Sequence, residues 1–188
     1  EINEVDELLF LSAEDVEELC TTESVAAGLQ VVALVKRYFK TNVSLEGFFK
    51  MKNISDVAVI VQARLGSQRI PRKMIKPFAG TTLLDIMLEK IKHSSIIPQE
   101  NFFVSINEKE LLDVAKNHSV NIFHRSDISA KSEGTPLTDM YEWWNKIDFK
   151  YCILINACAP FLTIETIDEF INAYLETYSN GLFGVVEK

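Results

Sequence analysis

The chain has 188 residues, of which 47% are hydrophobic and 24% charged, a balance that indicates a folded globular protein and not a disordered one. Its net charge of −8 argues against general nucleic-acid binding, and its longest apolar stretch, residues 26–35, is too short to span a bilayer. Three cysteines without metal-ligand spacing, and the lack of a segment resembling a signal peptide, favour reduced thiols and a cytoplasmic location.

Charge is unevenly distributed along the chain. Residues 1–30 hold nine acidic residues and no Lys or Arg, whereas residues 64–76 hold five basic residues and no acid. A short basic segment in an acidic protein suits a small polyanion better than a long nucleic-acid duplex.

Residues 1–52 are predicted to be a small helical segment that caps the main domain or ends a preceding one. Ser12 and Asp15 fit the N-cap and the N3 acid of a helix over residues 14–20. Residues 23–40 are predicted to form a second helix, because their apolar side chains share a broad face at helical spacing. Neither helix carries a motif with evident chemistry.

The main domain is placed at residues 53–188, where apolar runs of strand length alternate with helical patterns. The predicted strands cover residues 57–61, 102–106, 120–124, 151–155 and 182–186. The predicted helices cover residues 82–93 and 110–117, residues 135–147 with Thr135 as cap, and a stretch capped by Thr163. This alternation predicts an α/β fold of three-layer, Rossmann-like type, in which a mainly parallel sheet has helices on both faces.

The predicted helix over residues 135–147 contains two adjacent tryptophans. Trp144 falls on its apolar stripe and is predicted to lie in the core. Trp143 lies off that stripe and is predicted to be partly exposed or to lie at an interface.

Ligands of such sheets bind beyond the carboxyl ends of the strands, so the loop after the first predicted strand is a candidate site. Residues 62–73 read QARLGSQRIPRK. The loop supplies several cations, a glycine that lets backbone N–H groups approach closely and a hydroxyl donor, which together suit a triphosphate. It matches neither the Walker loop nor the dinucleotide-binding glycine pattern. On these residues alone, the alternative is a solvated basic turn at the edge of the sheet.

The pattern A-R-x-x-S-x-R-x-P-x-K over residues 63–73, directly after an apolar strand, resembles the signature of the acylneuraminate and deoxyoctulosonate cytidylyltransferases. The likeness extends over residues 57–188, and its first motif is specific. Supporting segments occur in the expected order at residues 77–84, 104–107, 124–126 and 156–163.

The resemblance implies a reaction of CTP with a 2-keto sugar acid that yields a CMP-sugar and pyrophosphate. Catalysis of such an in-line displacement consists mostly of positioning and charge neutralisation. By position in the motif, Arg64 and Lys73 would be catalytic, holding the triphosphate and stabilising charge on the leaving pyrophosphate. Asn156 would face the sugar. The nucleotide-binding residues that the resemblance implies are Ala63, Arg64, Leu65, Gly66, Ser67, Arg69, Lys73 and Ser105.

The family further implies Mg²⁺ as cofactor and a homodimer of the complete protein. The net charge and the short apolar stretches predict no nucleic-acid or membrane partner. The chain starts without Met and stops at Lys188, directly after a predicted strand, so we expect it to be cut at both ends. The family's dimerisation element and a further metal-binding Asp would follow residue 188.

Two departures from the family pattern matter. Asn107, followed by Glu108, stands where relatives often carry an Asp that binds Mg²⁺, and a neutral amide ligates hard cations more weakly than a carboxylate. The metal ligands are therefore unassigned. Cys158 and Ala159 stand where relatives carry hydroxyl residues, which leaves the identity of the sugar open.

Two other functions fit the sequence. The related spore-coat polysaccharide type of nucleotidyltransferase-like protein has a similar Gln-Ala-Arg-x-Gly-Ser-x-Arg start, although residues 156–160 lack its usual Gly-Asp-x-Pro segment. From a different class, the chain fits a catalytically silent binding or scaffold domain. Cys158 could act as a nucleophile, but a packed thiol is favoured because no triad pattern accompanies it.

Overall fold

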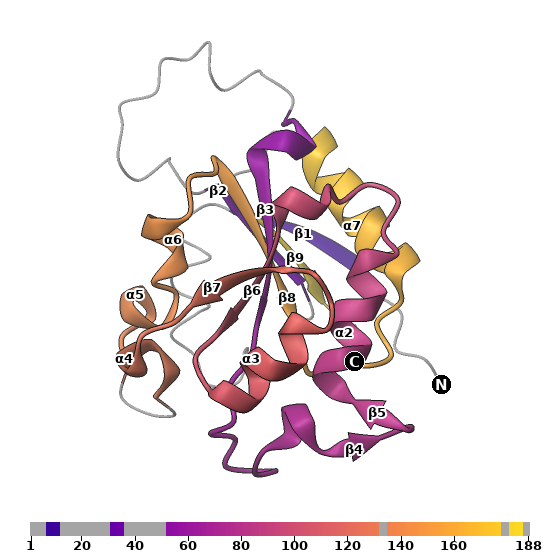
Figure 1. Ribbon diagram of the computed structural model, residues 1–188. Coiled ribbons are helices and arrows are strands. Elements are labelled where there is room, and N and C mark those ends of the chain that lie inside the picture. Colours follow the sequence, from indigo (N-terminus) through magenta and orange to yellow (C-terminus); the bar gives the residue numbers. More distant parts are fainter. Residues whose placement is uncertain (1–6, 12–30, 36–51, 132–134, 178–180, 186–188) are drawn as a thin grey trace.

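The computed structural model describes residues 7–11, 31–35, 52–131, 135–177 and 181–185. Figure 1 shows a twisted central sheet with helices on both sides. Its strands are β1 (Glu7–Leu11), β2 (Val31–Val35), β3 (Val57–Gln62), β6 (Phe102–Ile106), β7 (Asn121–His124), β8 (Tyr151–Asn156) and β9 (Gly181–Val185). The α-helices are α2 (Leu83–Lys92), α3 (Lys109–Lys116), α4 (Asp127–Ala130), α5 (Leu137–Met140), α6 (Trp143–Lys146) and α7 (Ile164–Glu176). Smaller elements are η3 (Ile54–Asp56), η4 (Lys73–Ile75), η5 (Gln99–Asn101) and the hairpin of β4 (Pro77–Phe78) and β5 (Thr81–Thr82).

The sheet has the strand order β1-β9-β2-β8-β3-β6-β7. Strands β8, β3, β6 and β7 are parallel to one another, and β2 joins β8 in antiparallel fashion. The predicted α/β fold with a mainly parallel sheet is confirmed, and each of the predicted strands after residue 53 is present within a residue or two of its expected bounds.

Strand β3 is central and has both faces covered. Residues 57–61 are each at most 1% exposed. Val57, Val59 and Val61 belong to the core formed with α2, α3 and α7, whereas Ala58 and Ile60 pack with Trp143 on the other side. Burial on both faces explains why this run is continuously apolar, and each large side chain contributes about 1.5–3 kcal/mol.

The two long helices each begin with a threonine cap. The hydroxyl of Thr82 accepts a hydrogen bond from the N–H of Asp85 at the start of α2. Thr163 does the same for the N–H of Thr166 at the start of α7, which confirms the predicted cap. Such caps satisfy N–H groups that the helix itself leaves unpaired.

The prediction of a helix over residues 23–40 is wrong at Val31–Val35, which forms strand β2. These residues pair with β8 and β9, so partners more than a hundred residues away in sequence decide the conformation. The run contains three β-branched valines, a residue type that favours strands, although the spacing of its apolar residues also suits a helix. Residues 7–11 also form a strand and not part of a helical segment. The predicted helix over residues 14–20 lies outside the described residues, and the boundary between residues 52 and 53 stays a prediction.

The predicted helix over residues 135–147 is also wrong in detail. The structure has two single turns, α5 and α6, because the chain leaves the helical conformation at Tyr141 (φ −106°, ψ 44°). Pro136, and not Thr135, is the N-cap of the first turn. The break resets the helical phase, so Trp143 is buried at 1% exposure while Trp144 is half-buried, the reverse of the prediction.

Candidate functional site

The loops that follow four parallel strands begin side by side at one edge of the sheet. Gln62, which ends β3, is paired with Ser105 in β6 and with Asn156, which ends β8. Ile106 at the end of β6 is paired with His124, the last residue of β7. The carboxyl ends of these strands therefore share the edge at which sheets of this kind bind ligands.

The basic loop, residues 63–73, folds back on its own backbone. The carbonyl oxygen of Leu65 accepts hydrogen bonds from the N–H groups of Ser67 (2.8 Å) and Arg72 (3.2 Å). Arg72 takes the left-handed conformation (φ 58°) immediately before η4. Met74, in η4, is buried in the core and fixes the far end of the loop. The loop is thus a compact turn attached to the core at its end.

Two charged side chains from neighbouring loops hold the start of the basic loop. Glu108 Oε1 accepts a hydrogen bond from the N–H of Leu65 at 2.7 Å. Arg125 Nη1 donates to the carbonyl oxygen of Ala63 at 3.3 Å, and the N–H of Ala63 donates to the carbonyl oxygen of Ser105 at 3.1 Å. The backbone on either side of the predicted catalytic Arg64 is therefore fixed by residues that follow β6 and β7.

Arg125 is a buried cation next to this loop, with 4% of its surface exposed. Its Nε donates to Ser129 Oγ at 3.1 Å, and its Nη2 donates to the carbonyl oxygen of the same serine. Burial lowers the pKa of Arg125, the nearby carboxylate of Glu108 raises it, and the charge of Arg64 lowers it again. Because a buried charge is costly without partners, Ser129 and Glu108 are what make this cation tolerable.

The two predicted catalytic residues both lie on the basic loop. Arg64 is half-buried, and its Nη1 donates to the backbone carbonyl of Lys131 at 2.5 Å. Lys73 is half-buried at the start of η4, and Arg69 is exposed. Within the described part of the chain, the side chains of Lys73 and Arg69 form no hydrogen bond or ion pair, so their charges are available to an anion.

Ser105, predicted to lie near the nucleotide, is fully buried in β6. Its hydroxyl has no hydrogen-bond partner among the residues that the structure describes. The structure therefore brings the backbone of Ser105 to the basic loop but keeps its side chain inside the core. A nucleotide contact by this hydroxyl stays a prediction.

The predicted sugar-side residue, Asn156, shapes the turn after β8. Its Oδ1 accepts a hydrogen bond from the N–H of Cys158 at 2.9 Å. Cys158 is exposed, and its Sγ lies 3.9 Å from Sδ of Met74 in η4. The loop after β8 thus contacts the end of the basic loop, and the predicted sugar-side and phosphate-side segments are neighbours.

The described residues offer no convincing Mg²⁺ site. No group of three or more His, Cys, Asp or Glu side chains within the described ranges could hold a metal ion. The side-chain amide of Asn107 donates to the carbonyl oxygen of Arg125 (2.9 Å) and to Asp127 Oδ1 (3.1 Å), and Glu108 Oε1 is bound by Leu65. Glu108 Oε2, however, is buried without a hydrogen-bond partner among the described residues, so one carboxylate oxygen after β6 is left for a hard cation.

Glu108 and Arg125 are the residues of this site whose bracing role the sequence did not reveal. Glu108 directly follows the segment 104–107 that resembles the family, and Arg125 lies within the segment 124–126. A carboxylate two residues after a strand end was the signal available for Glu108. Nothing in the pattern distinguished a buried arginine from a solvated one.

A basic loop after the first of several parallel strands, with its neighbours gathered at the carboxyl edge, defines the class of nucleotide-binding α/β domains. Residues 58–187 match the cytidylyltransferase family, and the chain belongs to that family.

Among curated proteins, the chain is 26% identical over 129 residues to the spore coat polysaccharide biosynthesis protein SpsF of Bacillus subtilis, covering 68% of this chain and 53% of the relative. It is 28% identical over 144 residues to a pseudaminic acid cytidylyltransferase of Campylobacter jejuni, covering 73% of this chain and 59% of the relative. The chain thus spans between half and two-thirds of the length of these relatives.

Solved structures share the fold. A cytidylyltransferase from Leptospira borgpetersenii superposes with a TM-score of 0.54 at 22% identity, covering 69% of this chain and 60% of the other. A CMP:2-keto-3-deoxy-manno-octonic acid synthetase complexed with CTP superposes with a TM-score of 0.52 at 14% identity, covering 63% and 46%. Among the residues described, no helix is both long and apolar enough to cross a membrane.

Proposed function

We propose that the complete protein is a nucleotidyltransferase that transfers CMP from CTP to an acidic 2-keto sugar and releases pyrophosphate. The observation that carries this proposal is the basic loop: it lies at the carboxyl edge and is braced by Glu108 and Arg125, with Arg69 and Lys73 free of partners within the described chain. Support for cytidine and for an acidic sugar comes from the family and from the name of the Campylobacter relative.

In this proposal the anomeric hydroxyl of the sugar attacks the α-phosphorus of CTP. A bond forms between that oxygen and phosphorus, the bond from the α-phosphorus to the bridging oxygen breaks, and the hydroxyl proton passes to solvent. Arg64 and Lys73 would hold the triphosphate and neutralise charge on the departing pyrophosphate. The fixed backbone from Ala63 to Ser67, together with Arg69, would form the wall of the nucleotide pocket.

The acceptor would bind beside the loop that follows β8, where Asn156 is the proposed sugar-side residue. Cys158 and Ala159 supply no hydroxyl groups there, so the contacts to the sugar must differ from those of relatives with hydroxyl residues. We propose Mg²⁺ as the companion of CTP without assigning it a ligand in this chain. We also propose a cytoplasmic location and a homodimer of the complete protein.

A second candidate is supported by the match to SpsF, which is named for spore coat polysaccharide biosynthesis. In that case the nucleotide would be transferred to a different sugar at the same loop. A catalytically silent domain is the third possibility, and the poor fit of Asn107 to a metal ion favours it.

Nucleotide selectivity separates these functions. Isothermal titration of full-length protein with CTP, UTP, GTP and ATP, with and without Mg²⁺, should show the tightest binding for CTP and a gain in affinity on adding Mg²⁺. Equal affinity for all four nucleotides would contradict the cytidine assignment and leave only a general phosphate site. A lack of binding by every nucleotide would favour the silent domain.

A further inference from the structure

The ammonium group of Lys90 reaches from α2 to a neighbouring loop. Its Nζ donates to the carbonyl oxygen of Pro160 at 2.8 Å and also to that of Leu162. The side chain is half-buried, and burial lowers the pKa of Lys90. In the part of the chain that the structure describes, no acidic side chain forms an ion pair with it. The ammonium group of Lys90 therefore binds two backbone carbonyl oxygens and, within the described residues, no carboxylate.

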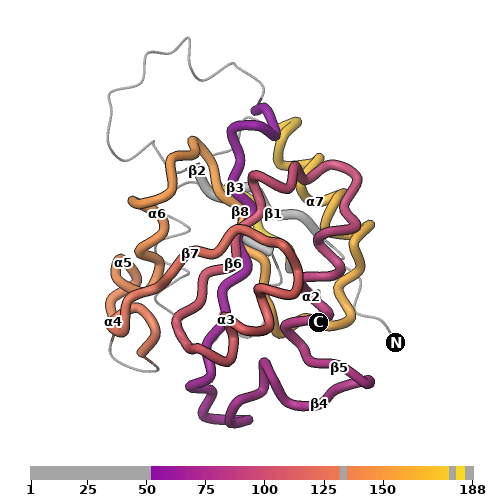
Figure 2. Tube along the Cα trace, viewed as in Figure 1, coloured from indigo at the N-terminus to yellow at the C-terminus, as the bar shows by residue number. Residues whose placement is uncertain are grey.

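These carbonyls belong to the β8–α7 loop, residues 157–163, which begins directly after the proposed sugar-side Asn156. Figure 2 shows this loop running alongside α2 before the chain enters α7. Phe161, between the two bonded carbonyls, is 74% exposed and so adds little packing to hold the loop. Lys90 is therefore a principal attachment of the middle of the loop.

The start of the loop is attached elsewhere. Asn156 Oδ1 accepts the N–H of Cys158, and Cys158 Sγ contacts Met74 in η4. The N–H of Leu162 donates to the carbonyl oxygen of Ala159 at 3.2 Å. These contacts fold the loop on itself, but they do not tie its second half to α2. Leu162 packs against the core that contains Leu88 and Ile91 of α2, and Lys90 supplies the polar connection between this helix and the loop.

We infer that Lys90 is a positioning residue that holds the β8–α7 loop, and with it the sugar-side wall of the site, at a fixed distance from the basic loop. The inference rests on the proposed function for the identity of the acceptor. It has a structural basis of its own, since α2 follows the β4–β5 hairpin at the end of the basic loop. One helix thus connects the phosphate-side and sugar-side segments.

The test compares three variants of the full-length protein. Lys90→Met keeps the aliphatic stem and removes the charge, Lys90→Arg restores a donor, and Lys92→Met is the control. Lys92 lies on the same helix but forms an exposed ion pair with Glu89. Hydrogen exchange, followed by mass spectrometry, reports on the loop without requiring any substrate.

We expect Lys90→Met to speed amide exchange in residues 157–163 about tenfold, with Lys90→Arg close to wild type and Lys92→Met unchanged. In steady-state assays, KM for a keto sugar acid should rise at least about fivefold while KM for CTP stays the same. Pseudaminic acid and 2-keto-3-deoxy-manno-octonic acid serve as the acceptors.

Unchanged exchange in Lys90→Met would overturn the inference. Faster exchange with an unaltered KM for the acceptor would also overturn it, because Lys90 would then serve stability alone. If the wild-type protein uses no sugar acid at all, the proposed function fails, while the exchange data still decide whether Lys90 holds the loop.

Discussion

At the scale of single residues, two carboxylates at the start of α3, Glu108 and Glu110, differ in their importance for stability. Glu108 is half-buried, its Oε1 accepts a hydrogen bond from the N–H of Leu65, and its charge raises the pKa of the buried Arg125. Glu110 forms an ion pair with Arg72 at 3.1 Å, with both side chains about half exposed. Exposed pairs of this kind contribute little to stability, whereas removing the partner of a buried charge is costly.

We therefore predict that two isosteric substitutions differ in their effect on stability. Glu108→Gln should lower the free energy of unfolding by about 1–3 kcal/mol, because Arg125 loses its counter-charge. Glu110→Gln should change it by no more than about 0.5 kcal/mol. Urea denaturation of both variants provides the comparison. Equal stability losses would show that Glu108 does not compensate the buried guanidinium.

Lys73 offers a residue-scale test of function without a stability effect. Its side chain has no polar partner among the described residues, so Lys73→Ala should alter stability by at most about 0.5 kcal/mol. The same change should weaken CTP binding at least tenfold, roughly 1.4 kcal/mol. Lys116→Ala is the matched control, since Lys116 forms an exposed ion pair with Asp113 on α3. Unaltered CTP affinity in folded Lys73→Ala would restore the solvated-turn interpretation of the loop.

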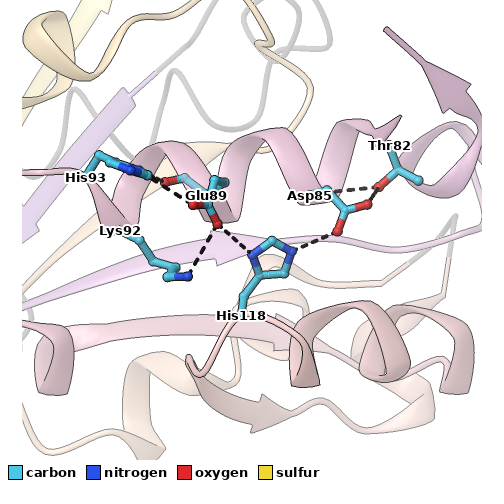
Figure 3. A network of polar contacts seen from close by, with 6 residues as sticks. All are labelled: Thr82, Asp85, Glu89, Lys92, His93 and His118. Atoms are coloured by element: carbon cyan, nitrogen blue, oxygen red, sulfur yellow. Dashed lines mark hydrogen bonds and ion pairs between the residues drawn. The ribbon is translucent and has the colours of Figure 1, made fainter. Parts of the chain in front are cut away.

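At the scale of elements, α2 and the segment after α3 are joined by a polar network around His118 (Figure 3). His118 Nε2 lies 2.8 Å from Asp85 Oδ1, and its Nδ1 lies 3.3 Å from Glu89 Oε2. The hydroxyl of Thr82 donates to Asp85 Oδ2 at 2.6 Å. The carboxylate of Asp85 thus binds Thr82 at the start of α2 and also His118, which follows α3.

This network predicts a pH dependence of stability. Burial alone would raise the pKa of Asp85, but hydrogen bonds from His118 and Thr82 outweigh it and lower the pKa below its ordinary 3.8. A carboxyl whose pKa is depressed in the folded state stabilises the protein above the unfolded pKa and loses that contribution as the pH falls. Wild type should therefore lose stability below about pH 4 more steeply than Asp85→Asn. Urea denaturation across pH 3–6 measures this, with the exposed Asp113→Asn as control. Parallel pH profiles for wild type and Asp85→Asn would contradict the assignment.

The elements also show what a sequence can and cannot reveal. Strand β3 could be predicted because its five apolar residues are buried on both faces, and the cap Thr163 because its hydrogen bond lies within three residues of sequence. Strand β2 was missed because its partners, Tyr151–Ile155, lie far along the chain. Trp143 was misplaced because one break at Tyr141 shifted the helical phase.

At the scale of the whole molecule, the site also has parts that depend on neighbouring residues and parts that depend on residues far apart in sequence. The basic loop could be found from its spacing, since all its members lie within one short segment. Its bracing could not, because Glu108 and Arg125 contact it across 43 and 62 residues of sequence. The burial that lowers the pKa of Arg125 arises only when β6 and β7 are placed beside β3.

The family relatives are longer than this chain, which covers 53% of SpsF and 59% of the pseudaminic acid cytidylyltransferase. Tests of turnover therefore belong to the full-length protein. In the proposed function, the binding of CTP draws on the basic loop, all of which lies within the described residues.

The most direct test of the proposed function is pyrophosphate release by the full-length protein. The assay supplies CTP and Mg²⁺ with a panel of 2-keto sugar acids, and repeats each reaction with UTP, GTP and ATP and with neutral sugars. We predict release that depends on both CTP and a sugar acid and that falls at least tenfold in Lys73→Ala. Release with a neutral sugar, or with another nucleotide in preference to CTP, would contradict a cytidylyltransferase that activates acidic sugars.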